Sequence, residues 1–148
     1  MSLLQQLNPV KISSTGEHLP IEATEWDAVF IPELAIMLSA DNVGDKELND
    51  EEADTACAAL TLGGFTDWRQ PSHRFELEAV LDLSKSYPAI DERFFRNTKS
   101  DWYRTKHEVA GSSGLVWVVY FDYGHVYGSY RYGRCWCRAV RSVSPASQ

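Results

Sequence analysis

The last third of the chain limits the possible folds most strongly. Residues 115–143, LVWVVYFDYGHVYGSYRYGRCWCRAVRSV, are β-branched and aromatic runs interrupted by Tyr123-Gly124 and Gly133. This pattern predicts an antiparallel meander of three strands, near residues 115–122, 125–132 and 135–143. Because helical periodicity precedes these strands, the predicted class is α+β and not a parallel α/β sheet.

A first helix is predicted in the middle of the chain. Asn49 precedes three acidic residues, and its side chain can accept hydrogen bonds from the amide groups of a first helical turn, so it is the expected N-cap. We expect Gly63-Gly64 to end this helix at its C′ position. The apolar stripe of the helix consists of Ala53, Ala56, Cys57 and Leu60.

A second helix is predicted after Pro71, with Ser72 as its N-cap and an end near residues 83–84. Its apolar stripe consists of Phe75, Leu77, Val80 and Leu81. Residues 85–100 are then predicted to form a long loop, which is anchored by Tyr87, Ile90, Phe94 and Phe95.

The first 40 residues are less decisive. Residues 1–25 are polar and predict an irregular N-terminal extension with room for one short edge strand. Val29–Ile31 predicts a strand, whereas Leu34–Leu38 fits either a strand or a helical turn. We expect residues 1–148 to form a single domain, because a chain of this length can bury one core.

The net charge of −7 hides an asymmetry along the chain. Residues 1–60 hold 12 acids and two bases, whereas residues 61–148 hold nine acids and 12 bases. One explanation is charge compensation across the surface of one domain; the other is a basic face for an acidic ligand. The residues available for such a face are Arg131, Arg134, Arg138 and Arg141. Nucleic acid is not an expected partner, because the chain is acidic overall and has no nucleic-acid motif.

Targeting signals and membrane spans are missing from the sequence. It contains no apolar run of about 18 residues, so we expect no membrane partner. The N-terminal MSLLQQLNPVKISSTG has no basic region followed by an apolar stretch, so we expect no secretory signal and a cytoplasmic location.

Motifs of catalysis and metal binding are also missing. There is no G-x-S-x-G, and the four histidines are scattered without the spacing of metal ligands. Cys135-x-Cys137 has no second pair at zinc spacing, so we interpret both cysteines as packing residues. The sequence therefore predicts no catalytic residue, no metal and no cofactor.

A group of tyrosines near the two C-terminal turns fits a sheet core poorly. They are Tyr123, Tyr127, Tyr130 and Tyr132, and they alternate with Gly, Ser and Arg, which is typical of recognition loops. Alternation along residues 125–132 places the polar side chains on the face opposite to Val126. The predicted binding residues are Tyr123, His125, Tyr127, Ser129, Arg131 and Arg134.

The segment GGFTDWRQP, residues 63–71, is predicted to be structural. Gly63 and Gly64 allow a sharp turn, and Trp68 is large enough to fill the space between the helices and the sheet. We expect Asp67 and Arg69 to fix this turn by charge-assisted hydrogen bonds to backbone groups.

Several short motifs together resemble one family. They are Asp67-Trp68-Arg69 with Glu76-Leu77, Pro88-Ala89-Ile90-Asp91 with Phe95, and the strand pair that contains Trp117. Over residues 34–143 the chain resembles the Lcl C-terminal-like domain family, a bacterial and phage domain named after collagen-like adhesins. The resemblance implies a C-type-lectin-like fold, in which two helices pack on a small twisted antiparallel sheet and long loops carry the ligand contacts. The residues that carry the structural part of the pattern are Gly63, Gly64, Asp67, Trp68, Arg69, Glu76 and Trp117.

The chain departs from the family pattern in three places. The family's Tyr-Trp-Ser-Ser strand appears here only as DWYRTKHE, residues 101–108. Gln70 replaces a leucine before Pro71, and Ala139 stands where the family has a cysteine in its terminal strand. Cys57 therefore lacks the partner that the resemblance implies, and Cys137 lies two residues away from that position. We expect three free thiols, as in a protein made in a reducing cytosol.

Two classes of function are consistent with these features. The first is a non-enzymatic recognition module, phage- or prophage-encoded, whose Tyr/Arg-rich C-terminal loops bind a saccharide, a polyanion or a protein. The second is an intracellular phage accessory protein that binds and inhibits a host protein. The protein would then lie in the host cytoplasm or in the virion, and it could form a homo-oligomer.

Overall fold

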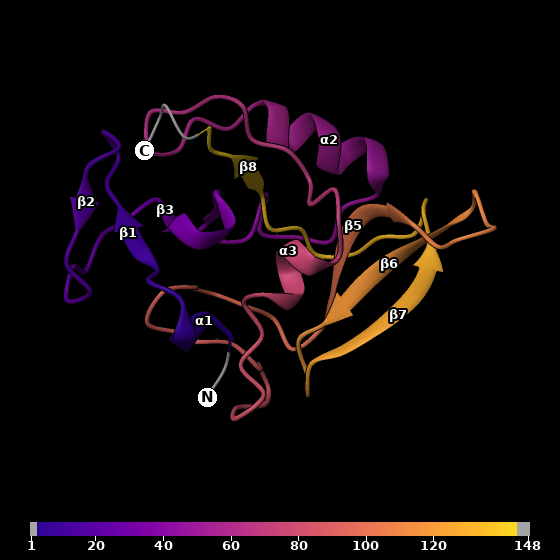
Figure 1. Ribbon diagram of the computed structural model, residues 1–148. Helices are drawn as coiled ribbons and strands as arrows, with labels where there is room; N and C mark the ends of the chain where they lie inside the picture. Colours follow the sequence, from indigo (N-terminus) through magenta and orange to yellow (C-terminus); the bar gives the residue numbers. More distant parts are fainter. Residues whose placement is uncertain (1–2, 145–148) are drawn as a thin grey trace.

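The computed structural model describes residues 3–144, which form two antiparallel sheets with few helices. A five-stranded sheet has the order β2-β1-β3-β4-β8, and a three-stranded sheet has the order β5-β6-β7. Figure 1 shows the three-stranded sheet on one side of the molecule, β1 and β2 on the opposite side, and α2 along the top. The predicted α+β class is confirmed.

The central strands of the five-stranded sheet are buried on both faces. Its strands are β1 (Val10–Ile12), β2 (His18–Leu19), β3 (Ala28–Ile31), β4 (Ile36–Ser39) and β8 (Val140–Ser142). All residues of β3 and β4 are buried, which explains why AVFI and IMLS are nearly continuous apolar runs. A short 3₁₀ helix, η1 (Pro32–Leu34), connects them, so Leu34–Leu38 is a helical turn followed by a strand.

The three-stranded sheet contains β5 (Trp102–Glu108), β6 (Leu115–Tyr120) and β7 (His125–Tyr130). The predicted strands near 115–122 and 125–132 are confirmed. The third strand of the predicted meander is wrong, because β8 pairs with β4 and β5 takes the third place in this sheet.

The residues after Gly133 leave this sheet because they cross to the other one. The Trp136 N–H donates to the Trp102 carbonyl and the Arg104 N–H donates to the Trp136 carbonyl, both at 2.9 Å. Farther on, Val140 and Arg141 are buried beside β4. The C-terminal segment therefore connects the two sheets.

The first predicted helix is α2 (Asp50–Ala58). Its N-cap is confirmed: the Asn49 side chain accepts from the Glu52 N–H at 2.8 Å, and the Glu52 carboxylate accepts from the Asn49 N–H at 3.0 Å. The predicted end is wrong, because the helix stops before Gly63-Gly64. These glycines form a separate tight turn with φ of 63° and 80°, a backbone region that favours glycine.

The second predicted helix is a single turn, α3 (Phe75–Glu78). Ser72 is not its N-cap, because its N–H and hydroxyl both donate to Glu76. Phe75 lies outside the expected buried stripe and is 44% exposed, whereas Leu77, Val80 and Leu81 are buried. The helix cannot continue because Leu81 pairs with Ile90 in an isolated antiparallel bridge. No helix within residues 3–144 is long and apolar enough to cross a lipid bilayer.

The expected irregular N-terminal extension is corrected by the structure. It contains α1 (Leu3–Gln6), and β1 lies inside the five-stranded sheet between β2 and β3. Leu4 and Ile12 are fully buried. The polar composition of this segment does not mean that it is exposed. Lys11 is buried, and its ammonium group donates to the Ile21 and Ala23 carbonyls at 2.7 Å.

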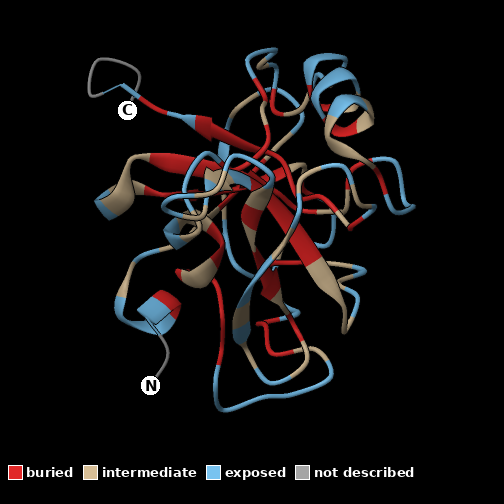
Figure 2. Ribbon diagram, turned by 90° about the vertical axis from the view of Figure 1, so that its right-hand side faces the viewer, coloured by how far each residue is buried: buried red, intermediate tan, exposed pale blue. Residues whose placement is uncertain are grey.

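The core consists of two main clusters on the two faces of the five-stranded sheet. One contains the loop residues Ile90, Phe94 and Phe95, which are buried as expected. The other lies under α2 and includes Trp68. Tyr87 does not anchor the loop, because its side chain is 59% exposed. Figure 2 shows the buried residues gathered in the central strands and the exposed ones in the peripheral loops.

Candidate functional site

Six aromatic side chains form a continuous row at one end of the three-stranded sheet, here called the aromatic strip; Trp102 and Tyr120 are half-buried and the other four are exposed. Its members are Tyr87, Trp102, Tyr120, Tyr123, His125 and Tyr127. Ring centroids lie 4.8 Å apart for Tyr87–Tyr123 and 4.9 Å apart for Trp102–Tyr127. The pairs Trp102–Tyr120, Tyr123–His125 and His125–Tyr127 are 4.5, 5.9 and 5.8 Å apart.

The register of the sheet explains how the strip arises. Trp102 lies opposite Tyr120, and Tyr120 lies opposite His125, so three neighbouring strands place these side chains on one face. The intervening residues Val119 and Val126 point to the other face and pack in the main core. One face of the sheet therefore packs on the main core. The other face carries the aromatic rings at one end and a small buried cluster of Val116, Val118 and Cys135 beside them.

Polar contacts hold the end of the strip nearest the β6–β7 turn. His125 Nδ1 lies 3.2 Å from an oxygen of Asp122. The Tyr87 hydroxyl donates to the Tyr123 hydroxyl, and this hydrogen bond is the main reason why the pKa of Tyr87 is raised to about 12. Tyr87 therefore stays a neutral hydrogen-bonding group at physiological pH.

The structure brings three of the predicted binding residues together and separates the other three. Tyr123, His125 and Tyr127 belong to the aromatic strip, whereas Ser129 lies farther along β7 opposite Val116. Arg131 forms an ion pair with Glu108 beyond the end of the strand. Arg134 forms an ion pair with Glu52 of α2 at 2.6 Å.

The hypothesis of a basic face is wrong. Arg138 is fully buried, where its guanidinium donates to the Ser39 and Ala40 carbonyls at 2.8 and 2.9 Å. Arg141 is also buried and donates to both oxygens of Asp67. Since all four arginines are bound within the fold, the charge asymmetry is largely compensated inside the domain.

Sequence analysis missed three members of the strip. Tyr87 was expected to anchor the loop instead, and the other two are the strand residues Trp102 and Tyr120. Their signal was the alternation of residues 102–108 and 115–120, which places them on the same face as Tyr127. This signal needs the register between β5 and β6, and the meander predicted from the C-terminal residues did not include β5.

A second group of charged and aromatic residues surrounds Trp68 and is here called the Asp-Trp-Arg corner: Asp67, Trp68, Arg69, Glu76 and Arg141. Trp68 is 4% exposed, and its indole N–H donates to the Leu62 and Phe65 carbonyls at 3.3 and 3.1 Å. Arg69 donates to both oxygens of Glu76, at 3.1 and 2.9 Å. Asp67 was expected to bond to backbone groups. Its carboxylate instead accepts a hydrogen bond from the Arg141 side chain.

Two further positions of the family pattern have clear contacts. Trp117 is half-buried under the guanidinium of Arg74, which lies 4.6 Å from the ring centroid. Gln70 is buried, donates to the Asp50 backbone carbonyl, and accepts from the Nε of buried Arg104 at 2.8 Å. The glutamine that replaces the family's leucine therefore belongs to a buried polar network.

The cysteines are arranged differently from the expectation. Cys57 has a neighbour, because its Sγ lies 3.8 Å from that of Cys137. All three cysteines are free and buried. A hydrogen bond with Cys57 and burial both raise the pKa of Cys137, so this thiol stays protonated. That three free thiols are titrated in the denatured protein stays a prediction.

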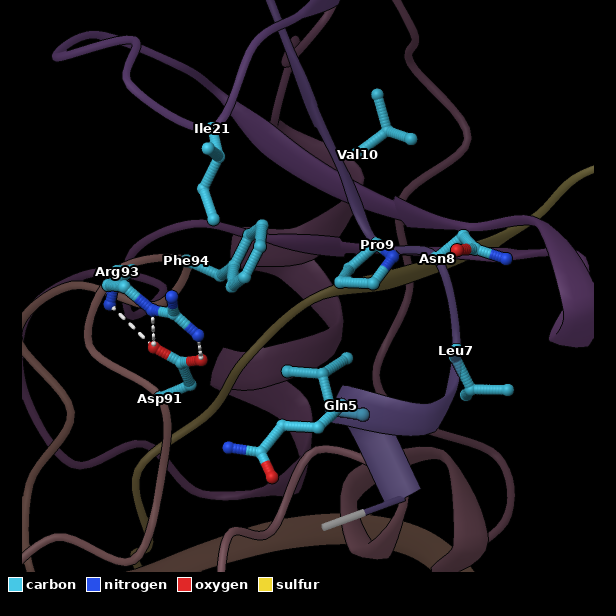
Figure 3. Close-up of a pocket in the computed structure, with 10 residues that line it drawn as sticks. Gln5, Leu7, Asn8, Pro9, Val10, Ile21, Asp91, Arg93 and Phe94 are labelled. Carbon is cyan, nitrogen blue, oxygen red and sulfur yellow. Dashed lines mark hydrogen bonds and ion pairs between the residues drawn. The ribbon is translucent and has the colours of Figure 1, made fainter. Parts of the chain in front are cut away.

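A cleft of about 330 Å³ lies between α1 and the loop that contains Asp91 (Figure 3). Its wall is mostly apolar, and its main charges are Asp91 and Arg93, which are paired at 2.7 Å. Within residues 3–144, no group of three histidine, cysteine or carboxylate side chains could hold a metal ion.

Comparison with known families agrees with the motifs. The sequence model of the Lcl C-terminal domain family matches residues 23–141, which include both sheets' central strands, the Asp-Trp-Arg corner and the aromatic strip. No curated protein matches the chain closely enough to count as a relative. Because the match covers most of the chain, the protein belongs to the Lcl C-terminal domain family.

Proposed function

We propose that this domain is a non-enzymatic recognition module that binds its ligand through the aromatic strip. The observation that carries the proposal is the continuous row of rings on the face of β5, β6 and β7 that points away from the main core. Tyr123 and Tyr127 are 55% and 44% exposed, and exposed aromatic patches of this kind are typical of interaction surfaces. Tyrosine and tryptophan give a large contact area at a small cost in conformational entropy.

The fold is, in this proposal, a variant of the C-type-lectin-like fold. Two antiparallel sheets, few helices and a long loop before β5 are compatible with that architecture. A recognition or adhesin-like role in a bacterial or phage protein agrees with the family.

An enzymatic role has little support in the chemistry of the strip. His125 is its titratable base, and its closest polar partner is Asp122. Ser129 lies on the same face, but opposite Val116 at the other end of the sheet. A nucleophile within hydrogen-bonding distance of a base, which acyl transfer would require, is not formed by these residues.

The test uses two matched variants. Tyr123→Ala/Tyr127→Ala removes two exposed rings of the strip, and Tyr132→Ala removes one ring that is 76% exposed outside it. A glycan array and a pull-down from bacterial lysate should detect a ligand of the wild-type protein. We expect the double variant to lose that ligand and Tyr132→Ala to keep it. Retention of the ligand by the double variant would disprove the proposal.

The second candidate, an accessory protein that occludes a host protein, is favoured by the acidic first turn of α2. Its exposed carboxylate Glu51 lies beside Asp50 and Glu52. Substitution of Glu51 by glutamine would weaken binding to such a partner, whereas substitution in the aromatic strip would not.

A further inference from the structure

The protein places its own cations over three of its other tryptophans: Trp26, Trp117 and Trp136. The Lys11 ammonium lies 3.7 Å from the ring centroid of Trp26, and the Arg96 guanidinium lies 4.2 Å from it. Arg74 covers Trp117 at 4.6 Å, and Lys99 lies 5.3 Å from Trp136. Cations are attracted to ring faces because the face of an aromatic ring is electrostatically negative.

Trp102 differs from these tryptophans. Its ring contacts Tyr120 and Tyr127, both in edge-to-face orientation. Within residues 3–144 no lysine or arginine lies over Trp102 or over any other ring of the aromatic strip. Trp68 lacks a cation as well, but it is buried in the core. The rings of the strip therefore have no lysine or arginine of the described chain over their faces.

Two carboxylates lie at the same end of the sheet. Asp101 immediately precedes Trp102, and Asp122 follows the end of β6. Their backbones are neighbours, because the Phe121 N–H donates to the Asp101 carbonyl at 3.0 Å, and the Asp101 carboxylate accepts from the Trp102 N–H at 2.7 Å. In the described part of the chain, neither carboxylate forms an ion pair with a lysine or arginine, and Asp122 interacts with His125 alone among basic side chains.

We propose that the aromatic strip binds a positively charged segment of a partner protein, with an arginine or lysine side chain over Trp102 or Tyr127 and beside Asp101 and Asp122. This inference rests on the function proposed above and names the chemistry of its ligand. Arginine fits best, because its flat guanidinium stacks on rings while donating to carboxylates. A polyanion is disfavoured, since the two carboxylates would repel it.

The surrounding charges support this assignment. Arg131 and Arg134, the exposed cations nearest in sequence to β7, are engaged with Glu108 and Glu52. Neither is available to neutralise the strip. The net charge of −7 also favours encounter with a basic partner. A saccharide could stack on the same rings and donate hydroxyls to the same carboxylates, so it is the alternative that the experiment must separate.

The experiment measures the binding of a fluorescent peptide in which three arginines are spaced by glycine and serine. The matched peptide carries citrulline, which keeps the shape of arginine without its charge. A neutral oligosaccharide and a sulfated polysaccharide are tested in parallel. We expect the arginine peptide to bind with a Kd below about 1 mM and the citrulline peptide to bind about tenfold more weakly or not at all.

Four variants locate the site. Trp102→Leu, Tyr127→Leu and Asp122→Asn should each weaken binding of the arginine peptide, by about tenfold for the loss of a ring that stacks on the cation. If Trp102→Leu does not fold, Tyr127→Leu still tests the site, because Tyr127 is more exposed and its substitution should disturb the fold less. Glu51→Gln removes an exposed charge from α2 at the opposite surface and should leave binding unchanged.

The outcomes separate the inference from the proposed function. If Glu51→Gln weakens binding as much as Asp122→Asn, or if citrulline binds as well as arginine, the inference is wrong, because the attraction is non-specific or does not depend on charge. Binding of the oligosaccharide, lost in Tyr127→Leu, with no binding of the arginine peptide would overturn the inference but retain the recognition function. If no probe, lysate protein or glycan depends on the strip, both fail.

Discussion

The Asp-Trp-Arg corner and the aromatic strip use the same kinds of residue in opposite ways. At the corner, Trp68 is buried, and the charges of Asp67, Arg69 and Glu76 all have side-chain partners within the chain. In the strip, four of the six rings are exposed, and the neighbouring carboxylates Asp101 and Asp122 have no lysine or arginine partner in the described residues. Tryptophan and charged residues alone therefore do not indicate function. What differs between the two regions is whether the rings are buried and the charged groups are paired within the chain.

The largest expected effect comes from the corner. Trp68→Ala removes a ring that fills the cluster under α2, so we expect a loss of about 3–5 kcal/mol in the free energy of unfolding and failure to fold at growth temperature. Urea denaturation followed by circular dichroism measures this loss. A variant that stays folded and cooperative but loses ligand would make Trp68 a contact residue and remove the contrast between the two regions.

A smaller effect is expected at Gln70. Gln70→Leu introduces the residue typical of the family, yet it leaves the Nε of buried Arg104 without its acceptor. We expect a loss of about 1–3 kcal/mol, because a buried charged donor without a partner is costly. Denaturation of Gln70→Leu and of Gln70→Leu/Arg104→Met measures the coupling. If Gln70→Leu is as stable as the wild type, the network is dispensable.

The sequence predicts well those features that depend on local chemistry. The N-cap Asn49 and the strands β3, β6 and β7 follow from neighbouring residues, and the structure confirms them. Prediction from the sequence fails where the pairing of a strand or the burial of a side chain depends on residues far away in the chain. Residues 140–142 have the composition of a third meander strand but pair with β4, and Lys11 is polar but lies inside the sheet.

The candidate site also contains residues that local sequence predicts and residues that it does not. Exposed tyrosines beside glycine turns are visible in the sequence, so Tyr123 and Tyr127 were predicted. The arginines were misplaced because the side chains that engage Arg131, Arg134 and Arg141 lie 23, 82 and 74 residues away in the chain. Arg138 is buried with no carboxylate bound directly to it, a case that composition does not predict.

Acid should weaken the corner more than the strip. Burial alone would raise the pKa of Glu76, but the hydrogen bonds and charge of Arg69 outweigh it and hold the pKa below the usual 4.5. The folded pKa is therefore below the unfolded one, so this stabilisation is present above pH 4.5 and is lost as the pH falls through the folded pKa.

Denaturation at pH 7 and at successively lower pH measures this loss for the wild type, Glu76→Gln and Glu78→Gln. We expect Glu76→Gln to cost about 1 kcal/mol at pH 7 and to flatten the pH dependence. Glu78 forms a longer pair with Arg74 at 3.7 Å, so Glu78→Gln should behave like the wild type. An unchanged pH dependence in Glu76→Gln would show that the corner's charges do not stabilise it.

The smallest effect on stability is expected for substitutions in and next to the aromatic strip. Tyr127→Ala/Arg131→Ala changes one partly exposed ring and one arginine of a surface ion pair, so the free energy of unfolding should change by about 0.5 kcal/mol or less for each substitution. Binding of the arginine peptide should nevertheless be lost. The single variants assign the loss: Tyr127→Ala should account for all of it, because Arg131 is engaged with Glu108 outside the strip. If Arg131→Ala alone abolishes binding while Tyr127→Ala has no effect, recognition depends on the arginine end of β7 and the aromatic strip is not the site.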